Sequence, residues 1–525
     1  MGDPKRHSPR AKESSTLEST PCSSTPGSST PGSSTHCSRR SALRLGIALA
    51  LTPLIRTRLS RAEPPCASVV AEHDLTKLES LLPGRVHFAG DKQYDALTTS
   101  WNGRHRASPI AVVSAVSARD IAAALSWARQ RGIAVVPRSG GHSYIGSSLS
   151  DGLIIDVSPM SSLTYNEKNG LATIGAGARL GPIYGSLYCN HGQRTFTCGS
   201  CPSVGLSGIA VGGGYSSQSR LTGLTIDAIR RYEVVLADGS IVQADSSHES
   251  ELFWALRGGG ASFGIVSEVD VETRPWVPLS VVTMNWPWAA SAEAFAAWSA
   301  WIATLPSNAT STTTWSTVTG GSPRLRTQVR SLESLAAAQS LAQSLEYAVG
   351  STSTRTNSST AVPSCTEDGL GTGTPSKNVS LFATGSIPLS AAEMIKTAFD
   401  ARVGHPQIAQ SDLGQIISHA FGGQVAAVMP SDTAFPHRNA TLLSQILSGW
   451  SADATESRAL ANIAWVTELR DALQSSYGGG AYLNYPDENL TQWKSAYWGE
   501  NVSRLQRAKN TYDPDRVFRG RQFVL

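Results

Sequence analysis

Two nucleophilic side chains, His142 and Cys201, lie beside glycine-rich turns about sixty residues apart. His142 belongs to Pro137-Arg-Ser-Gly-Gly-His-Ser143, and Cys201 to Gly199-Ser-Cys-Pro-Ser-Val-Gly205, which Gly212-Gly-Gly214 follows. Because glycine has no Cβ, the backbone at these turns can approach a ligand closely and direct its amides at a phosphate. Imidazole and thiolate groups can also bond covalently to an electrophilic ring. The pattern suits a pyrophosphate-bearing cofactor that either side chain could hold covalently.

The chain resembles the berberine-bridge-enzyme-like (BBE-like) FAD-linked oxidases of the vanillyl-alcohol-oxidase, or PCMH-type FAD-binding, superfamily. The similar motifs are Arg138-Ser-Gly-Gly-His-Ser143, Gly199-Ser-Cys-Pro-Ser-Val-Gly205 and Gly212-Gly-Gly-Tyr215. The resemblance covers roughly residues 70–280 and the last forty. It implies FAD as the cofactor, attached twice, through His142 and Cys201.

The same resemblance implies further contacts to the flavin. Val204 matches a position that faces the flavin C4a edge, where a compact valine is compatible with oxygen access. Asn484 matches a cofactor contact in the closing segment. The other expected contacts are Arg138, Ser139, Gly140, Gly141, Ser143, Gly205, Gly208, Gly212, Gly213, Gly214 and Ile265.

Two tyrosines of Ala481-Tyr-Leu-Asn-Tyr-Pro-Asp487 are candidates for catalysis, although alone they would suit an aromatic core equally well. The resemblance makes Tyr485 the base that removes a proton from the substrate. A tyrosine has an unperturbed pKa near ~10, so Tyr485 needs a neighbour that stabilises its phenolate. Tyr482 is the first such neighbour. Others are Gln415, Gln424 and His437.

Other motifs indicate different chemistry, and each is incomplete. Gly141-His-Ser-Tyr144 imitates the Gly-x-Ser-x-Gly elbow of α/β-hydrolases with Ser143 as nucleophile, but the fifth position is Ile145. Gly175-Ala-Gly177 begins a dinucleotide fingerprint whose third glycine would fall at Leu180.

Cys198-Gly-Ser-Cys201 is formally a Cys-x-x-Cys motif. Zinc or redox chemistry would need a second ligand pair or a thioredoxin-like context, and neither is evident, so we expect no metal site. A disulfide between these two cysteines would exclude a flavin bond at Cys201.

Short apolar strands alternate with amphipathic helices around these motifs, which predicts an α+β domain. Ser117 offers a cap for one helix, and Asp238-Gly239 favours a tight hairpin turn. We expect strands at 110–114, 133–136, 152–156, 171–175 and 262–269, helices at 117–129 and 249–256, and a hairpin at 231–242.

At 525 residues the chain predicts more than one domain. We expect a PCMH-type FAD-binding domain over 70–277, an α/β substrate-binding domain over 278–478, and a segment over 479–525 that completes the FAD domain. In the second domain we expect helices at 290–303, 335–348, 391–399 and 458–474, and long polar loops at 307–330 and 349–380.

Residues 1–62 read as a disordered leader with a signal segment. The first forty are Ser/Thr/Pro/Gly repeats, and an apolar run from Leu45 to Ile55 precedes the cleavage candidate Ser60-Arg-Ala62. Eleven residues are too few to span a bilayer, which needs about 20. Beyond the leader, 34 basic side chains face 37 acidic ones, so we expect neither a nucleic acid nor a stable membrane partner.

Cysteine and sequon counts also indicate a secreted glycoprotein. Without the leader, five cysteines remain, and if Cys201 binds flavin the other four allow two disulfides in three connectivities. These four are Cys66, Cys189, Cys198 and Cys365. The six sequons begin at Asn308, Asn357, Asn378, Asn439, Asn489 and Asn501.

The sequence thus predicts a secreted, monomeric FAD-linked oxidase. Hydride would pass from an alcohol-type small molecule to covalent flavin, and O2 would be reduced to H2O2. The departure Tyr215-Ser-Ser217 after the glycines favours a role in secondary-metabolite biosynthesis. Two alternatives stay open: a carbohydrate oxidase, and a flavoprotein redirected to non-redox cyclisation or ligand binding.

Overall fold

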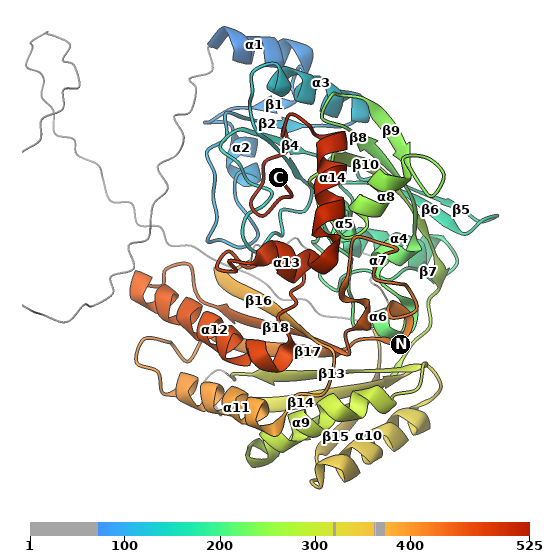
Figure 1. Cartoon of the computed structure of the whole chain (residues 1–525), viewed down its shortest axis with the longest axis vertical. Coiled ribbons are helices and arrows are strands. Elements are labelled where there is room, and N and C mark those ends of the chain that lie inside the picture. The colour runs from blue at the N-terminus through green and yellow to red at the C-terminus, as the bar shows by residue number, and fades with distance from the viewer. Residues whose placement is uncertain (1–71, 319–321, 362, 364–372) are drawn as a thin grey trace, which may run out of the picture. The chain divides into compact units, whose positions relative to one another are not determined.

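The computed structural model describes residues 72–318, 322–361, 363 and 373–525 (Figure 1). The expected leader and signal segment at 1–62 lies outside the described residues, as do Cys66 and Cys365. Within the described part of the chain, no helix is both long and apolar enough to cross a membrane.

The elements form an α+β fold, as expected. The strands are β1 (Val86–His87), β2 (Ala111–Ser114), β3 (Val135–Arg138), β4 (Leu153–Asp156), β5 (Leu163–Asn166), β6 (Leu171–Gly175), β7 (Arg194–Thr195), β8 (Ile229–Val235), β9 (Ile241–Ala244), β10 (Ile265–Glu272), β11 (Arg274–Pro275), β12 (Ser280–Trp286), β13 (Ala309–Ser316), β14 (Arg324–Ser331), β15 (Thr354–Ser359), β16 (Ser376–Ala383), β17 (Leu413–Ala420) and β18 (Leu442–Gly449). The α-helices are α1 (Glu72–Leu81), α2 (Lys92–Leu97), α3 (Ala118–Arg129), α4 (Leu180–Asn190), α5 (Leu206–Val211), α6 (Ser219–Thr222), α7 (Thr225–Ala228), α8 (Ser250–Leu256), α9 (Ser291–Trp301), α10 (Leu335–Val349), α11 (Leu389–Val403), α12 (Glu456–Tyr477), α13 (Trp493–Trp498) and α14 (Val502–Tyr512).

A four-stranded sheet in the order β1-β2-β4-β3 forms the first layer. Strands β2, β4 and β3 are parallel, whereas the short β1 is antiparallel to β2. Helix α3 begins after β2 because the hydroxyl of Ser117 accepts a hydrogen bond from the amide of Asp120. Strand β3 leads directly into the glycine turn before His142, so this sheet fixes the position of that turn.

A five-stranded antiparallel sheet, in the order β5-β6-β10-β8-β9, forms the second layer. The hairpin expected at Asp238-Gly239 is present, and the amide of Leu236 donates to the carbonyl of Ser240 (2.9 Å). The two sheets share one hydrophobic core with α3, α4, α8 and the C-terminal segment.

The C-terminal segment returns to this core and packs against it. The amide of Val135 on β3 donates to the carbonyl of Val517 (3.0 Å). The buried ammonium of Lys509 donates to the carbonyl of Ser262 (2.7 Å) and to Asp513 Oδ2 (2.6 Å). A buried charge is tolerated only when paired and hydrogen-bonded, so these contacts hold the segment in place.

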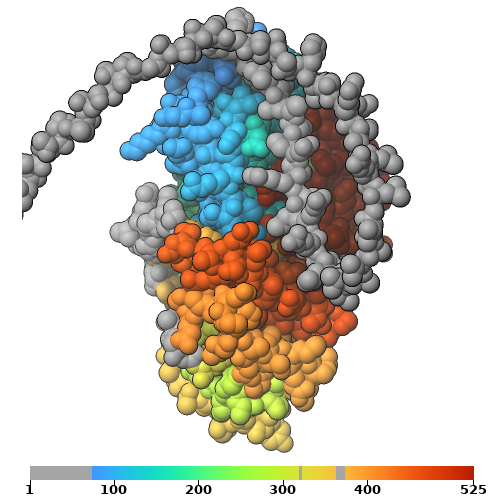
Figure 2. Space-filling model, turned by 90° about the vertical axis from the view of Figure 1, so that its left-hand side faces the viewer, coloured from blue at the N-terminus to red at the C-terminus, as the bar shows by residue number. Residues whose placement is uncertain are grey.

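A seven-stranded antiparallel sheet, in the order β15-β12-β14-β13-β17-β18-β16, forms the second part of the fold. Helices α9 to α12 cover one face and share its core, while the other face is turned toward the first two sheets (Figure 1). The space-filling view of Figure 2 shows the orange surface of α11 and α12 below the blue surface of the first elements.

The sequence located the four helices of this part correctly, but the prediction of long polar loops between them was wrong. Residues 309–316 and 324–331, expected within a loop, are strands β13 and β14, and β16 begins inside the second expected loop. Thr and Ser side chains suit a pleated strand when one face meets polar partners. On β13, Thr313 bonds Thr327 toward the helices, while Thr312 faces the open side.

Candidate active site

One cavity of about 480 Å³ lies where the first domain, the C-terminal segment and the open face of the large sheet meet. Residues from 137–148, 199–217, 259–266 and 482–486 line it, together with side chains of β17 and β18. Its lining includes Arg138 and Arg521, and no Asp or Glu belongs to it. An electropositive cavity of this kind suits an anionic cofactor.

His142 is held in a defined orientation at this cavity. Its ring stacks on Trp101 with centroids 4.9 Å apart, and its Nε2 lies 2.9 Å from Ser203 Oγ. Burial, with smaller contributions from Arg179 and Arg138, lowers the pKa of His142 to about 4. The imidazole is therefore neutral near pH 7, as a nitrogen nucleophile must be.

Cys201 is an exposed, free thiol that lines the same cavity, so a disulfide with Cys198 does not consume it. Cys198 is also free and buried, so the four cysteines other than Cys201 do not form the two disulfides that their number allows. Burial raises the pKa of Cys198 to about 11, despite hydrogen bonds from Thr225 and Tyr184, so this thiol is inert. Cys189 is disulfide-bonded.

The glycines let the two motif loops touch. A Cβ on Gly140 would lie 2.3 Å from the amide nitrogen of Gly205, and one on Gly205 would lie 2.1 Å from Ser139 Oγ. A Cβ on Gly212 would lie 2.0 Å from Asn484 Oδ1. Only glycine allows these approaches, which bring the His142 turn, the Cys201 turn and the C-terminal segment around one cavity.

Most of the expected cofactor contacts line this cavity. They are Arg138, Ser139, Gly140, Gly141, His142, Ser143, Cys201, Val204, Gly205, Gly208, Gly212, Ile265 and Asn484. Gly213 and Gly214 do not line it. Gly213 has a φ of +128° and a Cβ there would contact Tyr482, whereas a Cβ on Gly214 would meet Thr225 Oγ1 at 2.0 Å, so packing explains both.

The competing motifs also have structural explanations. The hydroxyl of Ser143 accepts a hydrogen bond from the amide of Ser147 (2.9 Å), which is a turn contact. A Cβ on Gly177 would lie 1.9 Å from the carbonyl oxygen of Val157, and one on Gly175 would lie 2.3 Å from that of Met160. These two glycines serve close packing of the strand end.

The guanidinium group of Arg138 gives a further reason why the cavity fits FAD. Arg138 Nη2 donates to the carbonyl of Thr99 (3.0 Å), but its Nη1 is buried without a hydrogen-bond partner among the described residues. A buried, unsatisfied cationic donor is costly, and a pyrophosphate oxygen would satisfy it. Arg138, the glycine turns and Asn484 would hold the cofactor, and His142 and Cys201 would lie beside its ring.

Tyr485 and Tyr482 both line the cavity, with ring centroids 5.1 Å apart. The phenolic oxygen of Tyr482 accepts hydrogen bonds from the Tyr215 amide (3.0 Å) and from Asn484 Nδ2 (3.0 Å). Burial raises the pKa of both tyrosines, and for Tyr485 the tyrosines Tyr144, Tyr482 and Tyr215 raise it further. Both phenols are therefore protonated near neutral pH.

The neighbours expected to assist Tyr485 lie elsewhere, with the exception of Tyr482. Gln415, Gln424 and His437 do not line the cavity, and the ring of His437 stacks on Phe382 with centroids 4.3 Å apart. These expectations were wrong because spacing along the chain does not show distance in the fold. Gln415 lies on the same face of β17 as Ile417 and His419 but beyond the cavity, and Gln424 and His437 lie in short 3-10 turns outside the sheet.

The large sheet contributes residues that sequence reasoning missed. Gln445 and His419 line the cavity from β18 and β17. Gln445 Nε2 donates to the hydroxyl of Tyr144 (3.2 Å) and to Asn378 Oδ1 (2.9 Å). The ring of Tyr144 lies 5.9 Å from that of Tyr485. Tyr144 could have been found from the sequence, since it lies two residues after His142, whereas the residues of the large sheet lie near no such motif.

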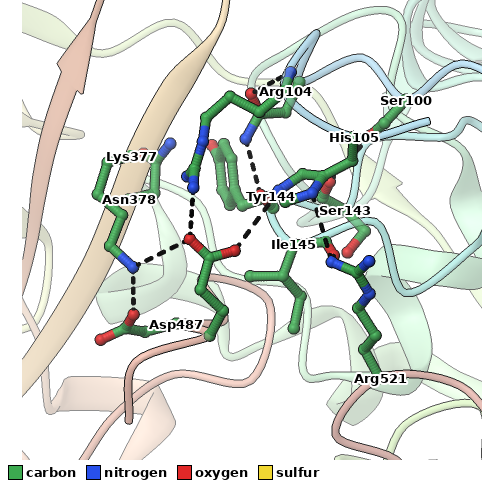
Figure 3. Close-up of polar contacts among 12 residues, drawn as sticks. Ser100, Arg104, His105, Ser143, Tyr144, Ile145, Lys377, Asn378, Asp487 and Arg521 are labelled. Carbon is green, nitrogen blue, oxygen red and sulfur yellow. Dashed lines mark hydrogen bonds and ion pairs between the residues drawn. The ribbon is translucent and has the colours of Figure 1, made fainter. Parts of the chain in front are cut away.

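A buried ionic cluster fixes the Tyr485 segment (Figure 3). Asp487 accepts from the ammonium of Lys377 (2.5 Å) and pairs with Arg470; both Asp487 and Lys377 are at most 2% exposed. Glu488 accepts from Arg104 (2.7 Å). Burial alone would raise the pKa of Glu488, but Arg104 and Lys377 hold it below its ordinary value. The cluster ties the C-terminal segment to β16, α12 and the loop before β2.

The loop between α2 and β2 joins the same cluster to the turn that carries His142. Asn102 Nδ2 donates to the carbonyls of Tyr144 (2.7 Å) and Ser376 (3.0 Å), and its Oδ1 accepts from the Ser376 amide. His105 Nε2 lies 3.0 Å from the Tyr144 carbonyl, and Arg521 donates to the carbonyl of Ile145 (Figure 3). The cavity walls are thus fixed relative to one another.

The fold and this cavity define an FAD-dependent oxidoreductase. The residues that could carry the cofactor and those that could act on a substrate line one cavity.

The chain belongs to the berberine-bridge-enzyme-like FAD-linked oxidoreductases. Residues 109–245 match the FAD binding domain family, and residues 481–524 match the berberine and berberine-like family. The FAD-linked oxidoreductase YgaK of Bacillus subtilis is 30% identical, with 84% of this chain and 97% of the relative covered. FAD-linked oxidoreductase dpmaF of Metarhizium anisopliae is 32% identical (83% and 88%), and chitooligosaccharide oxidase of Gibberella zeae 30% (83% and 91%).

Solved structures agree with this assignment. BBE-like 1 of Physcomitrella patens superimposes with a TM-score of 0.77 at 26% identity, covering 86% of this chain and 99% of its own. Glucooligosaccharide oxidase of Acremonium strictum, which has a 6-S-cysteinyl, 8α-N1-histidyl FAD, superimposes with a TM-score of 0.73 at 25% identity, covering 85% and 98%. The PCMH-type fold expected from the sequence is confirmed.

Proposed function

We propose that this protein is an oxidase with FAD bound covalently at both His142 and Cys201, acting on a hydroxyl-bearing small molecule. The observation that carries the proposal is the convergence of His142, Cys201 and Tyr485, from three distant segments, on one cavity. Cys201 is close enough to Tyr485 to influence its pKa. The doubly attached flavin of the Acremonium strictum oxidase supports the two attachment points.

When bound, FAD supplies the hydride acceptor and passes the electrons to O2, which yields H2O2. The chain supplies the attachment, orientation and proton handling. His142, neutral and fixed by Trp101 and Ser203, provides an imidazole nitrogen, and Cys201 provides an accessible thiol. Val204, at the cavity wall, is compact and leaves room for O2.

Tyr485, in the fraction present as phenolate, accepts the proton of the substrate hydroxyl at its phenolic oxygen as hydride leaves the adjacent carbon. Its raised pKa makes this phenolate a strong base but a scarce one near neutral pH. Tyr144 and Gln445, already joined by a hydrogen bond, can bind other polar groups of the substrate. The ionic cluster at Asp487 keeps Tyr485 in place.

The test has two stages. Acid precipitation of purified protein should leave a yellow pellet, which shows covalent flavin; a colourless pellet under a yellow supernatant would contradict the attachment. A panel of alcohols and oligosaccharides is then mixed with the enzyme without oxygen. Bleaching of the flavin, followed by H2O2 release on admission of air, supports the oxidase. Turnover without flavin reduction would identify a non-redox cyclase, and binding without turnover would identify a ligand binder.

Two substrate classes are consistent with the family. We favour a secondary-metabolite biosynthetic step because Tyr215-Ser-Ser217 gives the cavity a small, polar margin beside an aromatic wall. A carbohydrate oxidase is the second candidate, favoured by the similarity to a chitooligosaccharide oxidase. Flavin reduction by one class of the panel and not the other decides between them.

We also propose export of a monomeric glycoprotein after removal of the leader. Asn357 and Asn439 are exposed sequons, while Asn378 is only 4% exposed and is unsuited to glycosylation in the folded chain. Glycan mapping of protein secreted by a eukaryotic host should find Asn357 occupied and Asn378 free. Glycosylated Asn378 in folded protein would contradict the structure.

A further inference from the structure

Strand β14 presents a row of arginines on the open face of the large sheet. Its alternate residues Leu325, Thr327 and Val329 are buried toward the helices. The opposite face of the strand therefore presents Gln328 and a cationic stripe. The cationic stripe consists of Arg324, Arg326 and Arg330.

No carboxylate neutralises the cationic stripe among the described residues. Arg330 donates only to neutral groups, Thr312 Oγ1 (3.0 Å) and Gln328 Oε1 (2.5 Å), and Arg324 donates to Ser316 Oγ (3.2 Å). Among the residues that the structure describes, Arg326 makes no hydrogen bond and no ion pair. By contrast, Arg355 on β15 is paired with Glu346 on the helix side of the same sheet.

Unpaired guanidinium groups that are partly buried are costly. Arg326 and Arg330 are both half-buried, and burial lowers the pKa of Arg330 to about 10, with a further decrease from Arg326. Arg330 remains charged at neutral pH. Proteins normally pair such charges, so a missing anionic partner is the simplest explanation of the arrangement.

The register places the cationic stripe next to the cavity. Ile417 and His419 on β17 line the cavity; Ile417 pairs with Thr314, which pairs with Arg326. Two strand spacings, about 10 Å, thus separate the cavity wall from the strand of Arg326. The side chains between them are short threonines, and Thr312 Oγ1 lies 3.4 Å from His419 Nδ1.

The near end of the cationic stripe also borders the cavity margin. Thr310, which pairs with Arg330, donates to the carbonyl of Ser217, and Ser217 lines the cavity. Tyr215, another lining residue, is close enough to Arg330 for their charges to interact. A ligand in the cavity could therefore reach the guanidinium groups by extending over β13.

We propose that the substrate carries a carboxylate, which binds the cationic stripe at Arg330 and Arg326 while the hydroxyl that is oxidised lies at Tyr485. This inference rests on the proposed oxidase function and names its substrate class. Arginine binds carboxylates with two parallel hydrogen bonds, and the cavity itself has no Asp or Glu to repel an acid. The spacing requires a molecule about two rings long.

Two kinds of molecule carry such a group: an aromatic acid and a uronate-containing oligosaccharide. Isothermal titration calorimetry of the flavin-loaded protein would compare 4-biphenylcarboxylate with its methyl ester, and trigalacturonate with maltotriose. At least one acid should bind about tenfold or more tightly than its neutral partner, as expected for a charge-assisted hydrogen bond. The acid that binds more tightly than its neutral partner identifies the kind of molecule that supplies the carboxylate. Added salt should weaken this preference.

Variants assign the preference to the cationic stripe. The double change Arg326→Gln and Arg330→Gln should abolish the preference, and Arg330→Lys should retain part of it, because it keeps the charge without the planar fork. Arg355→Gln, the matched control on the other face, should retain all of it. Equal binding of acid and neutral partner in both pairs would overturn the proposal, as would a preference that survives the double change.

This experiment is independent of turnover. An absence of flavin reduction and H2O2 release with every hydroxyl-bearing substrate would refute the oxidase and leave the carboxylate preference intact. A working oxidase without the preference would refute only the substrate class.

Discussion

The imidazole of His142 lies stacked on the indole of Trp101, with 21° between the ring planes. The Trp101 amide in turn donates to the carbonyl of Gly141 (2.9 Å), and Ser203 on the Cys201 loop occupies His142 Nε2. Nδ1 has no partner among the described residues. The two motif loops therefore fix one imidazole nitrogen and leave the other for a covalent bond.

Tyr485→Phe should lower the turnover number by about 10²–10⁴-fold without loss of flavin, since it removes the proton acceptor. Because burial and the neighbouring tyrosines raise the pKa of Tyr485, the wild-type rate should increase with pH across the neutral range. Stopped-flow flavin reduction measures both effects. Tyr477→Phe, a buried phenol on the helix side of the sheet, is the control. A pH-independent wild-type rate would argue against Tyr485 as base.

Gly205→Ala should prevent assembly of the cofactor cavity. Its Cβ would lie 2.4 Å from the amide nitrogen of Gly140, and backbone atoms cannot yield cheaply, so we expect a loss of about 1–3 kcal/mol in unfolding free energy and little bound flavin. Gly385→Ala is the control, since nothing lies within 4 Å of its Cβ and the residue does not line the cavity. Denaturant unfolding and visible absorbance measure both. Full flavin content in Gly205→Ala would contradict the close approach.

Asp487→Asn should destabilise the protein by about 3–5 kcal/mol, because it leaves Lys377 and Arg470 without a buried counter-charge. Denaturant unfolding measures this. Asp471→Asn removes the other, solvent-exposed partner of Arg470 and should cost less than about 1 kcal/mol. Similar losses in the two variants would show that the buried cluster does not hold the C-terminal segment.

The stability should fall on acidification below pH about 6.5. Burial lowers the pKa of His105, His142 and His437 to about 4 and that of His419 to about 3. Between these values and 6.5 the unfolded chain binds more protons, so each histidine contributes up to about 1.4 kcal/mol of lost stability per pH unit. His437→Gln should flatten the profile of unfolding free energy against pH, and the exposed His248→Gln should not. A His437→Gln profile parallel to that of the wild type would contradict this role of the buried histidines.

The sequence could predict the cofactor side of the site because its determinants are local. His142, Cys201 and their glycines lie within short motifs whose backbone needs are visible in the residue types. The C-terminal tyrosines were predictable for the same reason. The two exceptions, Gly213 and Gly214, do not line the cavity, and in a sequence glycines that serve packing look identical to glycines that face a ligand.

The substrate side was not predictable in the same way. Gln445 and His419 reach the cavity only through the register of a seven-stranded sheet, whose strand β13 looks like a polar loop because Thr and Ser occupy both of its faces. The sequence left the pairing of Cys198 open, because counting cysteines cannot show that this thiol is buried beside Tyr184 and Thr225. Tertiary packing determines the position and burial of each of these residues, and a single sequence does not show it.

The attachment of one flavin to both side chains is the central claim, and peptide mass spectrometry tests it most directly. Proteolysis of freshly purified, active enzyme should yield one adduct in which FAD joins the peptide of His142 to that of Cys201. His142→Ala and Cys201→Ala should each retain flavin through acid precipitation by the remaining bond, and only the double variant should release all of it. Active enzyme with both peptides unmodified would contradict the account.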